Sequence, residues 1–197
     1  ICPGNTRTTS YRQATTNTYS SIIKIVVDNW YKTNIQDAGY SDKIADVIYC
    51  NDRSVNNNEG YGNNVVYYKV YERIVRNYAP DLKCNQKNDS FTVNDITDGN
   101  RALTYPVGLI TTDEISMAGG VYTINNSSFY LSTGNSFWTM SPASFANNHV
   151  YMWRLRYDGY VDNNYTNATN GIRPVISLKS SVQLQGNGTL ESPFNVQ

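Results

Sequence analysis

The strongest constraint on the fold lies at residues 151–162, where apolar and polar residues alternate on both sides of an Asp-Gly pair. A period of two predicts β-strands with one buried face, and Asp158-Gly159 predicts the turn of an antiparallel hairpin. A two-residue loop would set Leu155 opposite a charged residue and mix the two faces. A three-residue loop at 157–159 sets Leu155 opposite Val161 and keeps the apolar face continuous, so we expect that register.

This register sorts the hairpin side chains into an inner and an outer set. The inner set, which we expect to face the core, is Tyr151, Trp153, Leu155 and Val161. The outer set, which we expect to face solvent, is Met152, Arg154, Arg156, Tyr160 and Asp162. Rings, amides and guanidinium groups are typical of adaptable recognition surfaces, so we interpret the outer set as a ligand-binding face. Two alternatives stay open: Tyr, with 17 copies, and Asn are common throughout the chain, and a cross-strand Arg154–Asp162 pair also serves solubility.

The composition indicates a neutral domain whose polarity comes from amides and hydroxyls. Only 16% of the 197 residues are charged, and the net charge is zero. Binding to nucleic acid or to an anionic membrane needs clustered Lys and Arg, so neither partner is expected. No apolar run reaches the roughly 18 residues of a membrane span, so we expect no membrane insertion. The length predicts one domain over 1–197, with residues 1–17 extended or in a loop.

The three cysteines bear on location. Cys2, Cys50 and Cys84 form no C-x-x-C pair, and His149 is far from all of them in sequence, which disfavours a zinc site. In an exported protein we expect a Cys50–Cys84 disulfide, with Cys2 bonded to a partner upstream. In an intracellular protein all three would be free thiols. Because the chain begins at Ile1, we expect a fragment of a protein whose anchor lies upstream.

Helical spacing dominates the first part of the chain. An amphipathic core helix is predicted from Thr18 to about Asn34, capped by Thr18 or Ser20, although the same helix could bind a partner. Its apolar face is predicted to comprise Ile22, Ile23, Val26, Val27 and Trp30. A short second helix is predicted from Ser41-Asp42 through 44–48. Residues 65–78 have helical spacing and should end at Ala79-Pro80.

Strands are expected later in the chain. Residues 103–111 read as a buried strand, followed by a short helix with a capping box between Thr111 and Glu114 that ends at Gly119-Gly120. Residues 121–135 are predicted to form a strand and a hairpin-like turn. Residues 81–100 are predicted to be loop, with their Asp residues in solvated turns. Helices before strands indicate the α+β class.

Other chemistry finds little support in the sequence. The Asn51–Asn64 stretch carries oxygen donors, but it lacks the ordered spacing of a calcium loop, so calcium is an alternative and no cofactor is expected. His149 has no nucleophile nearby in sequence to assist, so the chain is not expected to be an enzyme. Arg173 is expected to brace backbone carbonyls, and a ligand anchor is its alternative. Three Asn-x-Thr glycosylation triplets occur, as chance allows where Asn is abundant.

Three motifs together carry a family resemblance. YPVGLITTDEISMAGG, then FWTMSP, then GIRPVISL resemble the C-type-lectin-like domains of bacterial surface and pilin-like proteins, some of which are the variable proteins of diversity-generating retroelements. The resemblance covers most of residues 20–197. It implies a compact α+β fold with two main helices and small antiparallel sheets. The Glu-Pro-Asn triplet of calcium-dependent sugar-binding lectins is absent, and no counterpart is evident for the paired cysteines of the related formylglycine-generating enzymes.

The resemblance also implies a hypervariable ligand surface between the Ser-Pro strand and the Gly-Ile-Arg-Pro strand. Transferred position by position, it comprises Ser144, Ala146, Asn147, Asn148, His149, Met152, Arg154, Arg156, Tyr157, Tyr160, Asp162, Asn163, Tyr165, Asn167 and Asn170. Because adenine mutagenesis of Asn-type codons cannot produce Met, Met152 is expected to be fixed if the site is diversified.

The leading functional hypothesis is therefore an extracellular or cell-surface bacterial recognition domain. It would bind a protein or glycan on another cell or host surface through residues 144–170, and the isolated fragment is expected to be monomeric. One alternative is a structural pilin or adhesin module that uses the same face for subunit packing. The other is an enzyme of the formylglycine-generating type.

Overall fold

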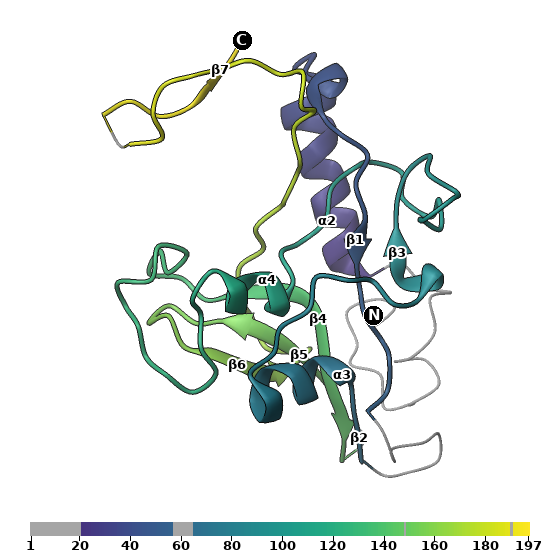
Figure 1. Cartoon of the computed structure of the whole chain (residues 1–197), viewed down its shortest axis with the longest axis vertical. Helices are drawn as coiled ribbons and strands as arrows, with labels where there is room; N and C mark the ends of the chain where they lie inside the picture. The colour runs from purple at the N-terminus through teal and green to yellow at the C-terminus, as the bar shows by residue number, and fades with distance from the viewer. Residues whose placement is uncertain (1–20, 57–64, 148, 190) are drawn as a thin grey trace.

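The computed structural model describes residues 21–56, 65–147, 149–189 and 191–197, and confirms the α+β class (Figure 1). The helical elements are α2 (Ile22–Tyr31) with a π-helical continuation (Lys32–Gln36), a 3-10 turn (Ser41–Lys43), α3 (Lys69–Tyr71) with a π-helical continuation (Glu72–Asn77), a 3-10 turn (Lys87–Asp89) and α4 (Thr112–Met117). The described strands are β1 (Tyr49–Cys50), β2 (Val65–Tyr67), β3 (Ser90–Phe91), β4 (Phe137–Ala146), β5 (His149–Leu155), β6 (Val161–Tyr165), β7 (Leu184–Gln185) and β8 (Asn195–Val196).

The strands form small antiparallel sheets, as expected. The largest has the order β2-β4-β5-β6, and two-stranded pairs join β1 to β3 and β7 to β8. Figure 1 shows α2 extending away from the four-stranded sheet, with the β7–β8 hairpin projecting beyond it. The segment 1–17, predicted to be extended or in a loop, lies outside the described residues.

Helix α2 confirms the predicted amphipathic helix but not its whole apolar face. Ser21 caps it by accepting a hydrogen bond from the backbone N–H of Lys24, while the predicted caps lie outside the described residues. Val27 is buried, but Ile22 and Val26 are 37% and 44% exposed. The predicted apolar face was wrong at those two positions. The helix packs against the core through Val27 and Tyr31, which are four residues apart and lie on one side of the helix.

The second predicted helix is not formed. Only the 3-10 turn at Ser41–Lys43 is helical, after which the chain is extended and Ile44 pairs with Leu178. Ile44, Val47 and Ile48 are β-branched, and here they line an extended segment that leads into β1. The sequence spacing was equally compatible with either state.

Residues 65–78 divide into a strand and a helix. Val66 is fully buried from β2, whereas Val70 and Ile74 are buried from the helical part. The helix ends at Tyr78, whose φ of 51° is left-handed, just before Ala79-Pro80 as predicted. The prediction of one continuous helix was therefore wrong at its start.

The predicted strands at 103–111 and 121–135 do not form. Leu103, Val107 and Leu109 are buried as expected, but the pairing there is an isolated bridge between Gly108 and Val175. Residues 121–135 make turns and one parallel bridge to β6. By contrast, the capping box at the start of α4 is confirmed, since the Thr111 and Glu114 side chains each bond the other residue's backbone N–H.

The hairpin register is confirmed. Leu155 pairs with Val161 and Arg154 with Asp162, and Gly159 closes the loop in the left-handed region with φ of 78°. Trp153 and Leu155 are fully buried with Val161 in one core cluster that also takes in α3 and α4. This cluster holds the hairpin to the body of the domain.

The side chains on the opposite face of the hairpin, which were expected to face solvent, are not all exposed. This corrects the expectation of an outward face. Met152 packs with Trp138 and Ile176 in a second core cluster built around α2. The four-stranded sheet thus has core on both sides, which alternation alone does not show. A thioether within a core is consistent with Met152 being fixed.

The turn at Gly159 offers a stability test with a matched control. A Cβ at Gly159 would lie 1.9 Å from the backbone oxygen of Asn126, whereas Gly39 has φ of 81° and nothing within 4 Å of a Cβ. Gly39→Ala should cost about 1–2 kcal/mol from left-handed strain alone, and Gly159→Ala about 3 kcal/mol or more because the clash is added. Urea unfolding measures both, and equal losses would contradict the close approach at Gly159.

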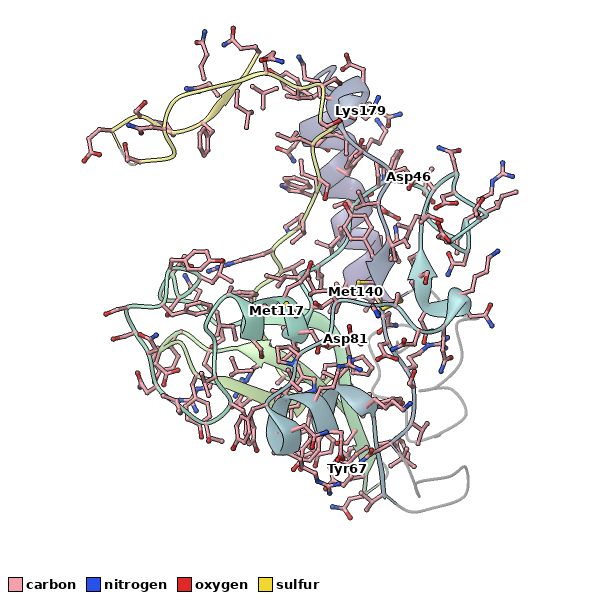
Figure 2. All side chains as sticks on the ribbon, in the orientation of Figure 1. Asp46, Tyr67, Asp81, Met117, Met140 and Lys179 are labelled. Carbon is pink, nitrogen blue, oxygen red and sulfur yellow. A yellow bond between two sulfur atoms is a disulfide. The ribbon has the colours of Figure 1, made fainter. Side chains whose placement is uncertain are left out.

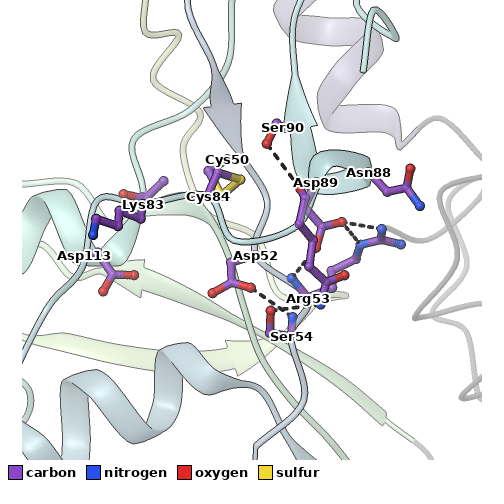
Figure 3. The surroundings of a disulfide bond; sticks show 12 residues. Cys50, Asp52, Arg53, Ser54, Lys83, Cys84, Asn88, Asp89, Ser90 and Asp113 are labelled. Carbon is purple, nitrogen blue, oxygen red and sulfur yellow. Dashed lines mark hydrogen bonds and ion pairs between the residues drawn. A yellow bond between two sulfur atoms is a disulfide. The ribbon is translucent and has the colours of Figure 1, made fainter. Parts of the chain in front are cut away.

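The disulfide between Cys50 and Cys84 is present, as expected for an exported protein (Figure 3). It lies beside charged side chains that the sequence had placed in solvated turns. Asp89 is fully buried and accepts hydrogen bonds from Nε (2.6 Å) and the backbone N–H (2.9 Å) of Arg53. The expectation of a solvated Asp89 was wrong, because pairing with Arg53 compensates the burial of its charge.

Candidate ligand-binding surface

One row of residues crosses all four strands of the large sheet. Tyr67 of β2 pairs with Ser144 of β4, Ser144 with Tyr151 of β5, and Tyr151 with Tyr165 of β6. Directly paired residues lie on the same face, so three tyrosines line up across the sheet. His149, two positions from Tyr151, extends the same face toward the β4–β5 turn.

The rings of this row and its neighbours are in contact. Ring centroids are 4.5 Å apart for Tyr67 and Tyr71, 4.6 Å for Tyr151 and Tyr165, and 5.1 Å for His149 and Tyr165. These five residues, Tyr67, Tyr71, Tyr151, Tyr165 and His149, are called the tyrosine surface below. Figure 2 shows Tyr67 at the end of the sheet beside α3, the helix that supplies Tyr71.

The tyrosine surface rests on the buried indole of Trp153. The rings of Tyr71 and Tyr122 lie 6.2 Å and 5.6 Å from it. Tyr71 and Tyr151 are partly buried against the same core cluster, while Tyr165 is 40% exposed. The inner edges of the rings are therefore fixed by packing while the outer parts reach solvent, which limits the conformational entropy lost on binding.

Ser144 does not face solvent, which corrects its assignment as a ligand contact. It is 6% exposed and lies in the row between Tyr67 and Tyr151. A small side chain at this position leaves room for large rings on either side. Ser144 therefore supports the neighbouring rings of Tyr67 and Tyr151.

The two arginines of the predicted surface are bound to carboxylates. Nε and Nη2 of Arg154 lie 2.7 Å and 3.1 Å from the two carboxylate oxygens of Asp162, and Nη1 donates to Asn170 at 3.2 Å. Nη2 of Arg156 is 3.0 Å from Asp158, and its guanidinium lies 5.0 Å from the ring centre of Tyr160. These groups were expected to point outward for a ligand, but here they brace the β5–β6 turn.

The predicted site residues therefore separate into groups. By register, Ser144, Ala146, His149, Asn163 and Tyr165 share the face of the tyrosine surface, whereas Met152, Arg154 and Asp162 lie on the opposite face. The remaining described ones, in turns, loops or flanking positions, are Asn147, Arg156, Tyr157, Tyr160, Asn167 and Asn170. Asn148 lies outside the described residues. The structure thus does not bring the whole predicted set onto one face.

Sequence reasoning missed part of the surface. Tyr67 and Tyr71 are far along the chain from residues 144–170, and Tyr151 had been assigned to the scaffold. The available signal was the Tyr-rich run at 65–71, VVYYKVY, which was interpreted as helix. Only the pairing of β2 with β4 brings Tyr67 into the row.

The chemistry of the row is uncharged. It offers aromatic faces and phenol hydroxyls, flanked by an ion pair in which Nη1 of Arg76 lies 2.9 Å from Glu72 and its guanidinium lies 5.8 Å from the ring centre of Tyr71. Burial raises the pKa of Tyr122, so this neighbouring phenol stays protonated at neutral pH. Such a set binds by ring contact and neutral hydrogen bonds.

The other proposed sites are structural or unsupported. Arg173 donates to the backbone oxygen of Leu131 at 2.7 Å and lies 3.9 Å from the ring centre of Phe137, which confirms its bracing role. Asp52, one of the possible calcium ligands, is 2.8 Å from Arg73, and Glu59 lies outside the described residues. In the described part of the chain, no group of three or more His, Cys, Asp or Glu residues could hold a metal ion.

Comparison with known proteins adds no family. Across the described residues, no helix is both long enough and apolar enough to cross a membrane. No protein-family model, curated protein or solved structure matches this chain.

Proposed function

We propose that this chain is a recognition domain that binds a protein or glycan ligand through the tyrosine surface and the adjoining loops of residues 144–170. The observation that carries the proposal is the row from Tyr67 through Ser144 and Tyr151 to Tyr165, in which three strands each contribute a tyrosine to one face. Tyrosine rings supply large contact area at a low entropic cost, and exposed loop amides such as Asn147 and Asn167 supply adaptable hydrogen bonds.

The proposal places the domain outside the cell, on a bacterial surface, with a C-type-lectin-like fold. Its support is the Cys50–Cys84 disulfide, since disulfides persist in oxidising compartments. The α+β arrangement of few helices and small antiparallel sheets is compatible with that fold. The ligand would belong to another cell or to a host.

Diversification of residues 144–170 by a retroelement is part of the same proposal. The exposed side chains of Tyr157 and Asn167 can vary without opening the core, whereas Trp153 and Leu155 are fully buried. Sequences of this locus from several isolates should therefore vary at the exposed positions and not at the buried ones. Changes spread evenly along the chain would contradict diversification.

Removal of one ring tests the binding surface. Tyr165→Ala should weaken binding to the ligand by about tenfold or more, because aromatic residues near the centre of an interface dominate its energy. Tyr130, which is 71% exposed and lies outside the tyrosine surface, provides the control: Tyr130→Ala should bind as the unchanged protein does. The measurement is binding to arrays of glycans and of host surface proteins. Equal binding by both variants would refute the assignment.

A structural module is the second candidate, and the projecting β7–β8 hairpin favours it. Leu184, Phe194 and Val196 are 46%, 59% and 42% exposed on this hairpin. Exposed apolar residues on a two-stranded hairpin are typical of a surface that packs against another subunit. Sedimentation of the purified chain separates the candidates. Concentration-dependent assembly that Phe194→Ala abolishes and Tyr165→Ala does not would show subunit packing through the hairpin, whereas assembly that Tyr165→Ala abolishes would replace recognition by subunit packing through the tyrosine surface.

A further inference from the structure

A cavity of about 190 Å³ lies between the start of α4 and the segment that leads into β1, beside the disulfide. Its walls come from the segment that leads into β1, from residues 81–84, from the start of α4 and from residues 175–177. Asp81 lies beside α4, its backbone N–H donating to Asp113 at 2.9 Å (Figure 2). Figure 3 shows Lys83 and Asp113 together on the side of the disulfide away from Asp89.

The lining combines an apolar wall with a surplus of negative charge. The charged groups are Asp52, Asp81, Asp113 and Glu114 against Arg73 and Lys83, a net charge of −2 from four acidic and two basic side chains. The apolar wall comprises Val47, Ile48, Leu82, Leu109, Val175 and the Cys50–Cys84 disulfide. This volume matches an aliphatic chain with one charged head, and it is too small for a drug-sized ligand.

Arg73 forms ion pairs with two of the four carboxylates. Its Nε and Nη2 lie 2.8 Å from the two oxygens of Asp113, and its Nη1 lies 2.8 Å from Asp52. Burial alone would lower the pKa of Arg73, but the hydrogen bonds and charges of Asp113 and Asp52 raise it above its ordinary value. Arg73 therefore stays charged and bound to both.

The other two carboxylates, Asp81 and Glu114, each have one oxygen that bonds a neighbouring group and one that does not. Oδ1 of Asp81 accepts the backbone N–H of Lys83, and Oε2 of Glu114 accepts the N–H and hydroxyl of Thr111. Across the described residues, no hydrogen bond or ion pair is made by Oδ2 of Asp81 or by Oε1 of Glu114. Lys83, exposed at the mouth, makes no ion pair within the described part of the chain.

We infer that this cavity binds an ammonium or guanidinium group carried on an aliphatic stem. The stem would lie along the apolar wall and the head would bond the unused oxygens of Asp81 and Glu114, which would offset the surplus negative charge. Either a free alkyl amine or an Arg or Lys side chain of a partner protein carries this chemistry. None of the five tyrosine-surface residues lines this cavity, so the inference does not depend on the proposed function.

Isothermal titration calorimetry with n-butylguanidine, an aliphatic stem with one cationic head, tests the inference, with n-butylurea as the uncharged control. Butylguanidine should bind the full chain and butylurea should not. Asp81→Asn keeps an oxygen for the N–H of Lys83 and should weaken butylguanidine binding about fivefold, whereas Lys83→Gln removes a competing charge and should strengthen it about fivefold. Asp37→Asn changes an exposed carboxylate elsewhere and should have no effect.

A second titration, with the capped peptide acetyl-Gly-Arg-Gly-amide against its citrulline counterpart, separates the two sources. Tighter binding of butylguanidine than of the Arg peptide supports a free alkyl cation as the ligand, and tighter binding of the Arg peptide supports a partner's side chain. The inference is overturned if neither cation binds, if the uncharged controls bind equally, or if Asp81→Asn binds as tightly as the unchanged chain. Thermal unfolding of each variant shows that the fold is retained.

Discussion

Asp89→Asn should lower the free energy of unfolding by about 3–5 kcal/mol, because it removes one charge of a buried ion pair and leaves the other. The Asp89 side chain is fully buried and the Arg53 side chain is only 13% exposed. The substitution retains the shape of the side chain, so the loss reflects charge and hydrogen bonding and not a cavity. Urea unfolding at neutral pH measures it.

The matched control is Asp37→Asn. Asp37 also pairs with a cation, at 2.7 Å from Lys32, but its side chain is 52% exposed. An exposed pair of this kind contributes about 0–1 kcal/mol, so the control should change stability little. Similar losses in the two variants would contradict the burial of Asp89.

Loss of the disulfide is the second large expected effect. The Cys50→Ala, Cys84→Ala double variant should be less stable by about 4 kcal/mol, because the bridge closes a loop with a sequence separation of 34 and limits the unfolded chain. The same bridge borders the cavity and lies close to Asp52, so we expect its removal to loosen the segment that leads to Arg53 as well.

Urea unfolding with and without dithiothreitol tests the disulfide. Reduction should cost the unchanged protein about as much as the double substitution does. Reduction should have no further effect on the double variant, which provides the control. Equal stability of the oxidised protein and the double variant would show that the bridge does not hold the fold together.

The sequence predicted local features well where one physical effect dominates. The Thr111–Glu114 capping box depends on residues three apart, and the three-residue loop at 157–159 depends on one buried face, so both were correct. The helix predicted at 44–48 was wrong. The spacing of the apolar residues there fits a helix, but β-branched residues also favour an extended chain, and Ile44 pairs with Leu178.

The candidate site was only partly predictable because its faces are set by contacts that are distant in sequence. Alternation separates odd from even positions but does not say that Met152 meets a second core cluster built around α2. Nor does it show that Asp162 holds Arg154 or that Tyr67 joins the row across β4. His149 and Tyr165 were predicted as site residues, and their ligand contacts stay predictions.

The central claim is that ligand binds the tyrosine surface and not the opposite face of the sheet. Chemical-shift mapping by NMR, with a ligand selected from the glycan and protein arrays, tests it most directly. The expected result is that the largest shifts occur at Tyr67, Tyr71, Tyr151, Tyr165 and His149. Largest shifts at Arg154, Arg156 and Asp162, with the five tyrosine-surface residues unchanged, would contradict it.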